Sequence, residues 1–182
     1  MTSHSDINDQ QLIQQFIQGD QSAFESLYAR HVKAVYNRVR YVVSDTDVED
    51  VTQEVFFAAL RSLHTFRGEA RFSTWLRTLT NHKVAEYYRK RSRKKESMQV
   101  DLKHAEKKGD RSRASDLEDR IALRRALMKL TEKYREVILL RFAEGMQFNE
   151  IAQYLGQNPE ATKSLFRRAM AALRDNLDVN DE

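Results

Sequence analysis

The sequence of 182 residues contains no cysteine, one proline and only five glycines. Without cysteine, the chain has neither a disulfide framework nor a thiolate metal site. Such scarce proline and glycine supply too few tight turns for a β-sandwich or a β-barrel. The dominant residues are instead Ala, Leu, Arg, Glu, Gln and Lys, all of which favour helices. The composition therefore predicts an all-α fold.

Long hydrophobic runs are also missing. The longest unbroken apolar stretch, Val55–Leu60, has six residues, whereas a helix needs about 20 to span a bilayer. The first residues, Met1–Gln11, lack the basic segment followed by an apolar segment that marks a secretory signal. We therefore expect a cytoplasmic protein with no membrane insertion.

Positive charge is concentrated rather than abundant. The net charge is only +4, from 31 Lys and Arg against 27 Asp and Glu. Six of the seven residues in Arg89–Lys95 are nevertheless basic. Such a local concentration of cations indicates a polyanionic partner.

Hydrophobic periodicity divides the chain into two helical parts. Apolar residues recur at helical spacing in four segments of the N-terminal half and in four more of the C-terminal part. Between Ser92 and Ser115 this period is lost, and a stretch so rich in charge cannot bury a core. We therefore predict two small helical domains, residues 1–95 and 116–182, joined by a flexible charged linker, residues 96–115.

The last two predicted helices, Asn149–Leu155 and Pro159–Leu177, are separated by a tight turn. Gly156 suits a helix C-cap, Asn158 is a good N-cap, and Pro159 takes the first helical position, where its missing N–H costs nothing. Two short helices joined in this way form a helix-turn-helix. Any helical hairpin can use the same caps, so the pattern alone is only moderately specific.

The final helix has two distinct faces on a helical wheel. An apolar stripe is expected to pack on the preceding helices and comprises Thr162, Phe166, Ala169 and Leu173. The opposite face suits the major groove of DNA, because Lys and Arg reach base edges or phosphates and small residues allow close approach. It comprises Glu160, Lys163, Ser164, Arg167, Ala171 and Arg174, with Arg168 at its flank. A solvated amphipathic helix with no DNA partner would show a similar pattern.

The third predicted helix carries a phenylalanine on the side away from its core stripe. The stripe comprises Val48, Val51, Val55, Phe56, Ala59 and Leu63, and the opposite face comprises Phe57 with Asp50, Gln53, Glu54 and Arg61. An exposed aromatic surrounded by charged side chains favours a docking surface. The alternative is that Phe57 packs on a neighbouring helix of its own domain.

The carboxylates of Asp50 and Glu54, one helical turn apart, also suggest an acid/base catalytic site or a metal site. The five histidines are scattered at positions 4, 31, 64, 82 and 104 and form no Glu-x-x-His pair, which disfavours a metal enzyme.

The segment Thr65–Ser73 places a cationic, glycine-containing loop between two aromatics. In the helix that follows, three side chains share a stripe that we predict to be exposed: Arg77, Asn81 and Tyr88. Cations that track phosphates, aromatics that stack on bases and an amide that reads a base edge are what single-stranded DNA requires. The alternative is a core tryptophan followed by a solvated basic tail, and for Trp75 and Leu79 themselves we expect burial in the core.

Three stretches, Asp45–Leu60, Phe66–Lys94 and Leu130–Arg174, match a known family in order, spacing and two-domain layout. They resemble the extracytoplasmic-function (ECF) sigma factors, the small two-domain branch of the bacterial sigma-70 family. The resemblance implies that the first domain is region 2, which binds the clamp helices of the RNA polymerase beta-prime subunit and opens the minus-10 element. It implies that the second domain is region 4, which binds the minus-35 element and the beta flap.

The resemblance, taken with the wheels, implies three sets of site residues. The polymerase-binding set comprises Asp50, Gln53, Glu54 and Phe57. The minus-10 DNA-binding set comprises Arg67, Gly68, Glu69, Arg71, Phe72, Arg77, Asn81, Tyr88 and Arg89. The minus-35 DNA-binding set comprises Lys163, Ser164, Arg167, Arg168 and Arg174.

The sequence departs from the family pattern at four positions of the last helix. Leu165 stands where the family often has arginine, and Met170 and Ala171 replace frequent basic residues, so the duplex contacts are expected to differ in number and in base preference. Thr162 replaces a usual valine, which is expected to loosen the core packing slightly.

These observations predict an alternative sigma factor that directs promoter recognition and transcription initiation without catalysis or a cofactor of its own. Its implied partners are core RNA polymerase, promoter DNA and an anti-sigma factor. The alternative hypothesis is a stand-alone helix-turn-helix transcriptional regulator. That hypothesis accounts for Asn149–Leu177 equally well, but it leaves the Asp50/Phe57 surface and the Arg77/Asn81/Tyr88 stripe without a purpose.

Overall fold

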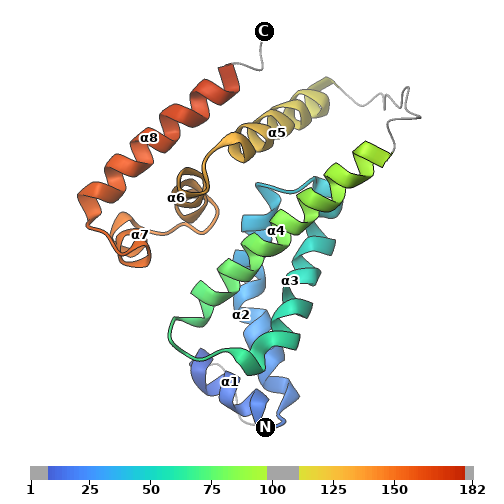
Figure 1. Cartoon of the computed structure of the whole chain (residues 1–182), viewed down its shortest axis with the longest axis vertical. Coiled ribbons are helices and arrows are strands. Elements are labelled where there is room, and N and C mark those ends of the chain that lie inside the picture. The colour runs from blue at the N-terminus through green and yellow to red at the C-terminus, as the bar shows by residue number, and fades with distance from the viewer. Residues whose placement is uncertain (1–7, 98–110, 179–182) are drawn as a thin grey trace. The chain divides into compact units, whose positions relative to one another are not determined.

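The computed structural model describes residues 8–97 and 111–178, and every regular element in these two ranges is a helix (Figure 1). The all-α prediction is therefore confirmed for the part of the chain that is described. The described residues divide into two compact units: residues 8–40 and 45–90 form the first, and residues 41–44, 91–97 and 111–178 form the second. The N-terminal unit is built from α1 (Asp9–Ile17), α2 (Gln21–Arg40), α3 (Val48–Ser62) and the larger part of α4 (Phe72–Ser97), with short 3-10 helices at Asp45–Asp47 and Leu63–Thr65.

Local capping fixes the starts of the first two helices. Asn8 and Gln11 form a capping box at α1, in which each side chain accepts a hydrogen bond from the other residue's backbone N–H. The Asp20 carboxylate accepts from the backbone N–H of Ser22 at 3.0 Å, as expected for the predicted cap of α2. Between the two helices the chain reverses at Gly19, whose φ of 104° favours glycine.

The core of the N-terminal unit follows the predicted stripes. Helix α1 packs on α2, and α2 packs on α3. The whole predicted stripe of the third helix, from Val48 to Leu63, is buried. Ile17 departs from its helix's apolar pattern, because it lies at the last turn of α1 and is more than half exposed.

Four aromatic side chains form a cluster at the start of α4. The ring of Phe72 lies 5.1 Å from His31, 6.0 Å from Phe66 and 5.6 Å from Trp75. Phe66 and Trp75 are themselves 5.5 Å apart. Tilted and edge-on ring pairs at such distances are favourable beyond the area they bury. The cluster therefore anchors both ends of the loop between residues 66 and 72.

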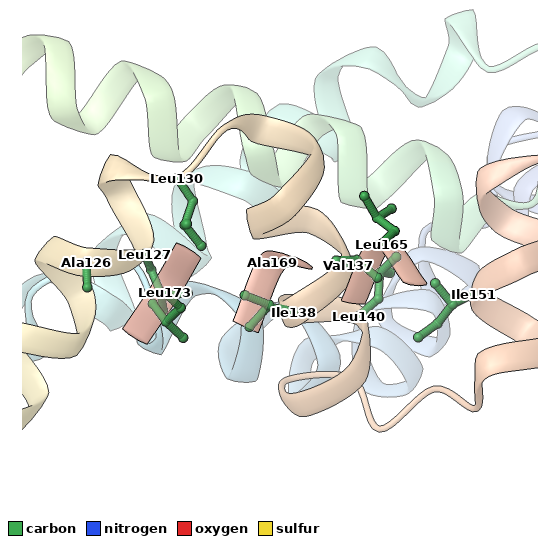
Figure 2. Packing of buried hydrophobic residues seen from close by; sticks show 10 residues of the cluster. All are labelled: Ala126, Leu127, Leu130, Val137, Ile138, Leu140, Ile151, Leu165, Ala169 and Leu173. Carbon is green, nitrogen blue, oxygen red and sulfur yellow. The ribbon is translucent and has the colours of Figure 1, made fainter. Parts of the chain in front are cut away.

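The C-terminal unit contains α5 (Arg111–Lys129), α6 (Glu132–Phe142), α7 (Phe148–Leu155) and α8 (Pro159–Asp178). Helix α8 packs against each of the other three. Figure 2 shows the buried core to which all four helices contribute. Its members are Ala126, Leu127, Leu130, Val137, Ile138, Leu140, Ile151, Leu165, Ala169 and Leu173.

Helices α7 and α8 form the predicted helix-turn-helix. Gly156 is left-handed, with a φ of 64°. The Asn158 side chain accepts a hydrogen bond from the backbone N–H of Ala161 at 2.7 Å, and Pro159 is the first residue of α8. All three predictions about this turn are confirmed.

The ends of the predicted linker, residues 96–115, are helical. Helix α4 continues through Ser97, and α5 begins at Arg111. The loss of hydrophobic period suggested an earlier end, but Arg, Lys and Glu extend a helix without any apolar residue. The rest of the linker, with Met98, Val100 and Leu102, lies outside the described residues.

Candidate functional site

One face of α3 is exposed and carries the first set of predicted site residues. Asp50, Gln53, Glu54 and Phe57 are all exposed, while the opposite face of the helix is buried. The Phe57 side chain is 57% exposed, so it does not pack inside its own unit. Leu60, one turn further on, is exposed as well and was absent from the predicted set. We call these five residues the α3 surface.

A lysine of α4 approaches the α3 surface. The Nζ atom of Lys90 lies 3.8 Å from Glu54 and 3.1 Å from Glu86. Hydrogen bonds from Lys83 and Lys90 lower the pKa of the Glu86 carboxyl to about 2. The hydrogen bond to Glu86 and the charge of Glu54 raise the pKa of Lys90. Lys90 is therefore held as a cation at the edge of the α3 surface.

The loop between residues 66 and 72 borders a pocket of about 730 Å³. Residues of this loop line it together with residues of α1 and α2, among them Asp9 and Arg30. Arg67, Glu69 and Arg71 are exposed, and Gly68 turns the loop at a φ of 73°. The carboxylate of Asp9 binds Arg30 at 3.2 Å and His31 at 2.8 Å, which ties α1 to α2 beneath the loop. The loop thus presents cations beside a hollow whose lining is partly polar and partly apolar.

Two of the predicted minus-10 residues, Phe72 and Arg77, are buried, and the predicted exposure of Arg77 was wrong. Phe72 belongs to the aromatic cluster, and Arg77 is almost wholly enclosed. A helical wheel places side chains around one axis but does not show which neighbouring helices cover each side. Among residues 72–93 of α4, the buried positions are Phe72, Leu76, Arg77, Thr80 and Val84. Trp75 and Leu79, which we expected in the core, are only partly buried.

Asn81 and Tyr88, two further residues of the predicted minus-10 set, are neither buried nor fully exposed. Both are half-buried, so the stripe that they were predicted to share with Arg77 is not an open surface. The amide oxygen of Asn81 accepts two hydrogen bonds from Arg38 of α2. The ring of Tyr88 packs on Tyr87 at 5.2 Å, and Arg89, beyond it, is exposed. The structure therefore brings Asn81 against α2, where sequence alone had placed it toward solvent.

The outward face of α8 has the predicted character. Lys163, Arg167, Arg168 and Arg174 are exposed, and Ser164 is half-buried. The Nζ atom of Lys163 lies 2.7 Å from Glu160, and this contact lowers the pKa of the Glu160 carboxyl. Lys163 thus faces a carboxylate on its own helix, which leaves the three arginines as the main cations of this face.

The inward face of α8 differs from its prediction at two neighbouring residues. Leu165, expected at a DNA-facing position, is a core residue, whereas Phe166 is only partly buried. Thr162 is fully buried, and its hydroxyl donates to the carbonyl of Asn158 and accepts from the amide of Gln157. A buried hydroxyl with both partners carries little penalty. The expected loosening at Thr162 is therefore offset by these hydrogen bonds.

Two kinds of feature are absent from the described part of the chain. No three His, Asp or Glu side chains there are grouped as ligands of a metal ion would be. Within residues 8–97 and 111–178, no helix has the length and apolarity to cross a membrane.

Comparison with known proteins accounts for both units. The model of sigma-70 region 2 matches residues 27–94, and the model of sigma-70 region 4 matches residues 120–173. The ECF RNA polymerase sigma-E factor of Escherichia coli (strain K12) is 32% identical over 177 residues, which cover 92% of this chain and 93% of the relative. The chain belongs to the sigma-70 family, in its ECF branch. It is an alternative sigma factor, a protein of transcription initiation.

Two solved structures resemble this sigma factor. CnrH, solved in complex with the cytosolic domain of CnrY, is 31% identical, with a TM-score of 0.62 over 94% of this chain and 97% of CnrH. The sigma factor RpoE of Bartonella quintana, solved with the anti-sigma factor NepR, is 22% identical, with a TM-score of 0.55 over 86% of this chain and 97% of RpoE. The second likeness concerns the fold alone.

This sigma factor also carries an exposed aromatic in its region 4 match that the sequence argument missed. The Phe142 side chain, at the end of α6, is 56% exposed. Its ring lies 5.8 Å from Phe166, which in turn lies 5.4 Å from Phe148, and the Arg141 guanidinium covers Phe148 at 5.4 Å. We call Phe142, Phe148 and Phe166 the aromatic patch. Apolar residues are common at helix ends, so no sequence signal distinguished Phe142 from a core position.

Proposed function

We propose that the α3 surface is the site at which this sigma factor binds core RNA polymerase, through the clamp helices of the beta-prime subunit. The observation that carries the proposal is a single helix buried on one face and, on the other, bearing an exposed phenylalanine among carboxylates. Buried aromatics supply most of the affinity of protein interfaces, and surrounding charges set orientation and association rate. Because Lys90 already lies 3.8 Å from the Glu54 carboxylate, it competes with a cation of the polymerase for that carboxylate.

We assign minus-10 recognition to the loop and to the adjoining part of α4, within a domain of residues 1–95. Arg67, Gly68, Glu69 and Arg71 are the contacts proposed for a base that has left the duplex, with the pocket beside the loop as its receptor. Asn81, Tyr88 and Arg89 extend this contact along the strand. Phe72 and Arg77 support the loop and the helix from inside rather than touching DNA.

The C-terminal domain, residues 116–182 in this proposal, binds the minus-35 duplex through α8. Arg167, Arg168 and Arg174 reach the major groove or its phosphates, with Lys163 and Ser164 near the helix start. The aromatic patch lies partly on other helices and offers apolar rather than cationic contacts. We assign the patch to the beta flap of the polymerase.

The proposal also includes the protein's role beside the polymerase, its place of action and a further protein partner. The protein lends sequence specificity to the polymerase and performs no catalysis itself, and it acts in the cytoplasm. A stand-alone helix-turn-helix regulator would need neither the α3 surface nor the cationic loop. CnrH was solved with a protein partner, and we expect an anti-sigma factor to bind this chain as well.

Removing the two carboxylates of the α3 surface tests the polymerase site. Asp50→Ala with Glu54→Ala is expected to weaken binding of the full chain to core polymerase by about 5- to 10-fold, because interface charges contribute modestly to affinity. Helix content measured by circular dichroism should stay unchanged, since both side chains are exposed. The control is Glu25→Ala with Glu49→Ala, which removes the same charge from exposed positions outside the surface. Equal affinities for the two double variants would refute the assignment.

The arginines of α8 should separate base readout from phosphate contact. Arg167 lies closest to the centre of the outward face, so we expect it to read a base. Arg167→Ala should then lower the binding free energy for the preferred base pair by about 1 to 3 kcal/mol and relax the specificity at that base pair. Arg168 is expected to contact a phosphate, so Arg168→Ala should weaken binding to all sequences about equally. It should also lower, by about one, the slope of the logarithm of the binding constant against the logarithm of the salt concentration. The measurement is a titration against a minus-35 duplex library at several salt concentrations, with the exposed Arg125 of α5 replaced by alanine as the control. If specificity fell only in the Arg168 variant, the two roles would be exchanged.

A further inference from the structure

The pocket beside the loop has one wall that comes from the start of α1. Asn8, Asp9 and Gln10 line the pocket there, together with residues of α2 and of the loop. The match to sigma-70 region 2 begins at residue 27, so this wall lies outside the residues that the family model covers. The match therefore assigns no role to the side chains of this wall.

Two of the three side chains in this wall hold α1 in place. The side chain of Asn8 forms the capping box of α1 with Gln11. The carboxylate of Asp9 binds Arg30 at 3.2 Å and His31 at 2.8 Å, and both of these partners belong to α2. These contacts fix the first turn of α1 against α2, so the backbone of the whole turn is held beside the pocket.

The third side chain, that of Gln10, is exposed and lies close to the loop. Its Nε2 atom is 3.8 Å from the place that a Cβ atom would take at Gly68. The amide therefore lies beside the point where the loop turns. Within residues 8–97 and 111–178, the Gln10 amide makes no hydrogen bond to another side chain. Its donors and its acceptor can therefore meet a ligand in the pocket.

We propose that Gln10 is a specificity-determining residue that selects adenine as the flipped base. The proposal rests on the proposed function, since it requires the loop to capture a base that has left the duplex. A carboxamide offers an acceptor and donors side by side. Adenine presents the complementary pair, its N6 amine and its N7 acceptor, and glutamine binds this pair in a bidentate manner.

The other three bases do not match the amide on the same edge. Guanine presents only acceptors there, cytosine only the donor at N4, and thymine only the acceptor at O4. Each of them can make one of the two hydrogen bonds but not both. A pocket of about 730 Å³ also has room for a purine. The geometry and the chemistry of the amide therefore favour adenine over the other bases.

The test measures base preference at each position of a bound strand. Holoenzyme assembled from core polymerase and the full chain is incubated with a pool of randomised single-stranded oligonucleotides, and the bound strands are sequenced. The unaltered chain should enrich adenine at the flipped position. Gln10→Ala should lower that enrichment by about tenfold, the value of one good bidentate pair, and leave the other positions unchanged. A merely structural role would instead change binding at several positions at once.

Two further variants are matched to Gln10→Ala. Gln10→Glu keeps the length and shape of the side chain but replaces its NH2 group with oxygen. It should lose the adenine preference, because an ionised carboxylate cannot donate to N7. Gln14→Ala removes an amide from an exposed position of the same helix outside the pocket, and it should keep the preference.

A modified base identifies the edge that Gln10 reads. 7-Deazaadenine lacks the N7 acceptor but keeps the N6 amine. At the flipped position, it should bind the unaltered chain about fivefold more weakly than adenine does, the value of one net hydrogen bond. Gln10→Ala should bind the two bases equally. Equal binding of the two bases by the unaltered chain, or an undiminished adenine preference in Gln10→Ala, would overturn the inference.

Arg71→Ala separates this inference from the function on which it rests. Arg71 is an exposed cation of the loop that lines the same pocket. If Arg71→Ala weakens strand binding while Gln10→Ala keeps every base preference, the loop still binds the strand and the inference about Gln10 fails alone. If neither variant changes strand binding, the proposed minus-10 site fails together with the inference. Circular dichroism of each variant checks that the helices are retained.

Discussion

Leu140→Ala is expected to lower the free energy of unfolding of the C-terminal unit by about 2 to 5 kcal/mol, the usual cost of deleting a fully buried leucine side chain. Leu140 is 0% exposed and belongs to the core shared by α5, α6, α7 and α8 (Figure 2). A helical unit of this size has a total stability of only several kcal/mol, on the order of 0.1 kcal/mol per residue. The substitution should therefore leave much of the unit unfolded at moderate temperature.

The measurement is amide hydrogen exchange of the full chain, which resolves the two units, combined with denaturant titration. Exchange should accelerate throughout α5 to α8, while α1 to α4 keep their protection. The matched control is Leu117→Ala on α5, since the Leu117 side chain is 48% exposed. The same atoms are deleted there without a comparable cavity, and stability should change by less than about 0.5 kcal/mol. Equal losses for the two variants would contradict the assignment of Leu140 to the core.

Phe57→Ala is expected to weaken binding to core polymerase by about 2 kcal/mol or more, roughly 30-fold, as truncation of a central interface aromatic does. This loss exceeds that of the Asp50 and Glu54 double variant because apolar burial supplies most of the affinity and the charges mainly orient the partners. Phe57 is exposed in the free protein, so its removal should leave the melting temperature nearly unchanged. The affinity is measured by titrating labelled sigma factor with core polymerase in the absence of DNA.

Tyr36→Ala is the control for this substitution, because Tyr36 is a partly exposed aromatic on α2 outside the α3 surface. It should bind core polymerase as the unaltered chain does. A normal affinity for Phe57→Ala would exclude the α3 surface as the docking site. A lowered melting temperature for Phe57→Ala would instead mean that the ring packs within its own unit.

Several features of the site could be predicted from the sequence alone. The stripe that includes Val55 and Phe56 placed Phe57 on the opposite face, and the structure exposes Phe57. In the helix-turn-helix, the roles of Gly156 and Asn158 followed from their conformational preferences. A helical wheel also predicted which cations of α8 are exposed, and the structure exposes them. These features depend on groups within one helical turn of each other, so the local sequence contains all the information that they need.

Other features of the site could not be predicted. Arg77 was expected to be exposed and is buried, while Leu165 was expected at a DNA-facing position and belongs to the core. Leu60 and Phe142 are exposed apolar residues that no pattern distinguished. In each case the outcome depends on which second helix covers a given side of the first. A helical wheel gives the direction of each side chain around one helix, but it gives no information about which other helices pack against that helix.

The sequence by itself determined that this protein is helical, where most of its helices begin, and which sides of α3 and α8 face outward. Capping and amphipathic periodicity depend on residues three or four positions apart, so both can be read from the local sequence. Only the tertiary structure decided that Arg38 meets Asn81, and that Phe72 joins His31 beneath the loop. Those contacts link residues far apart in the chain. Their formation depends on how α1, α2 and α4 pack together, because burial of the shared core selects one arrangement among the many that the local pattern allows.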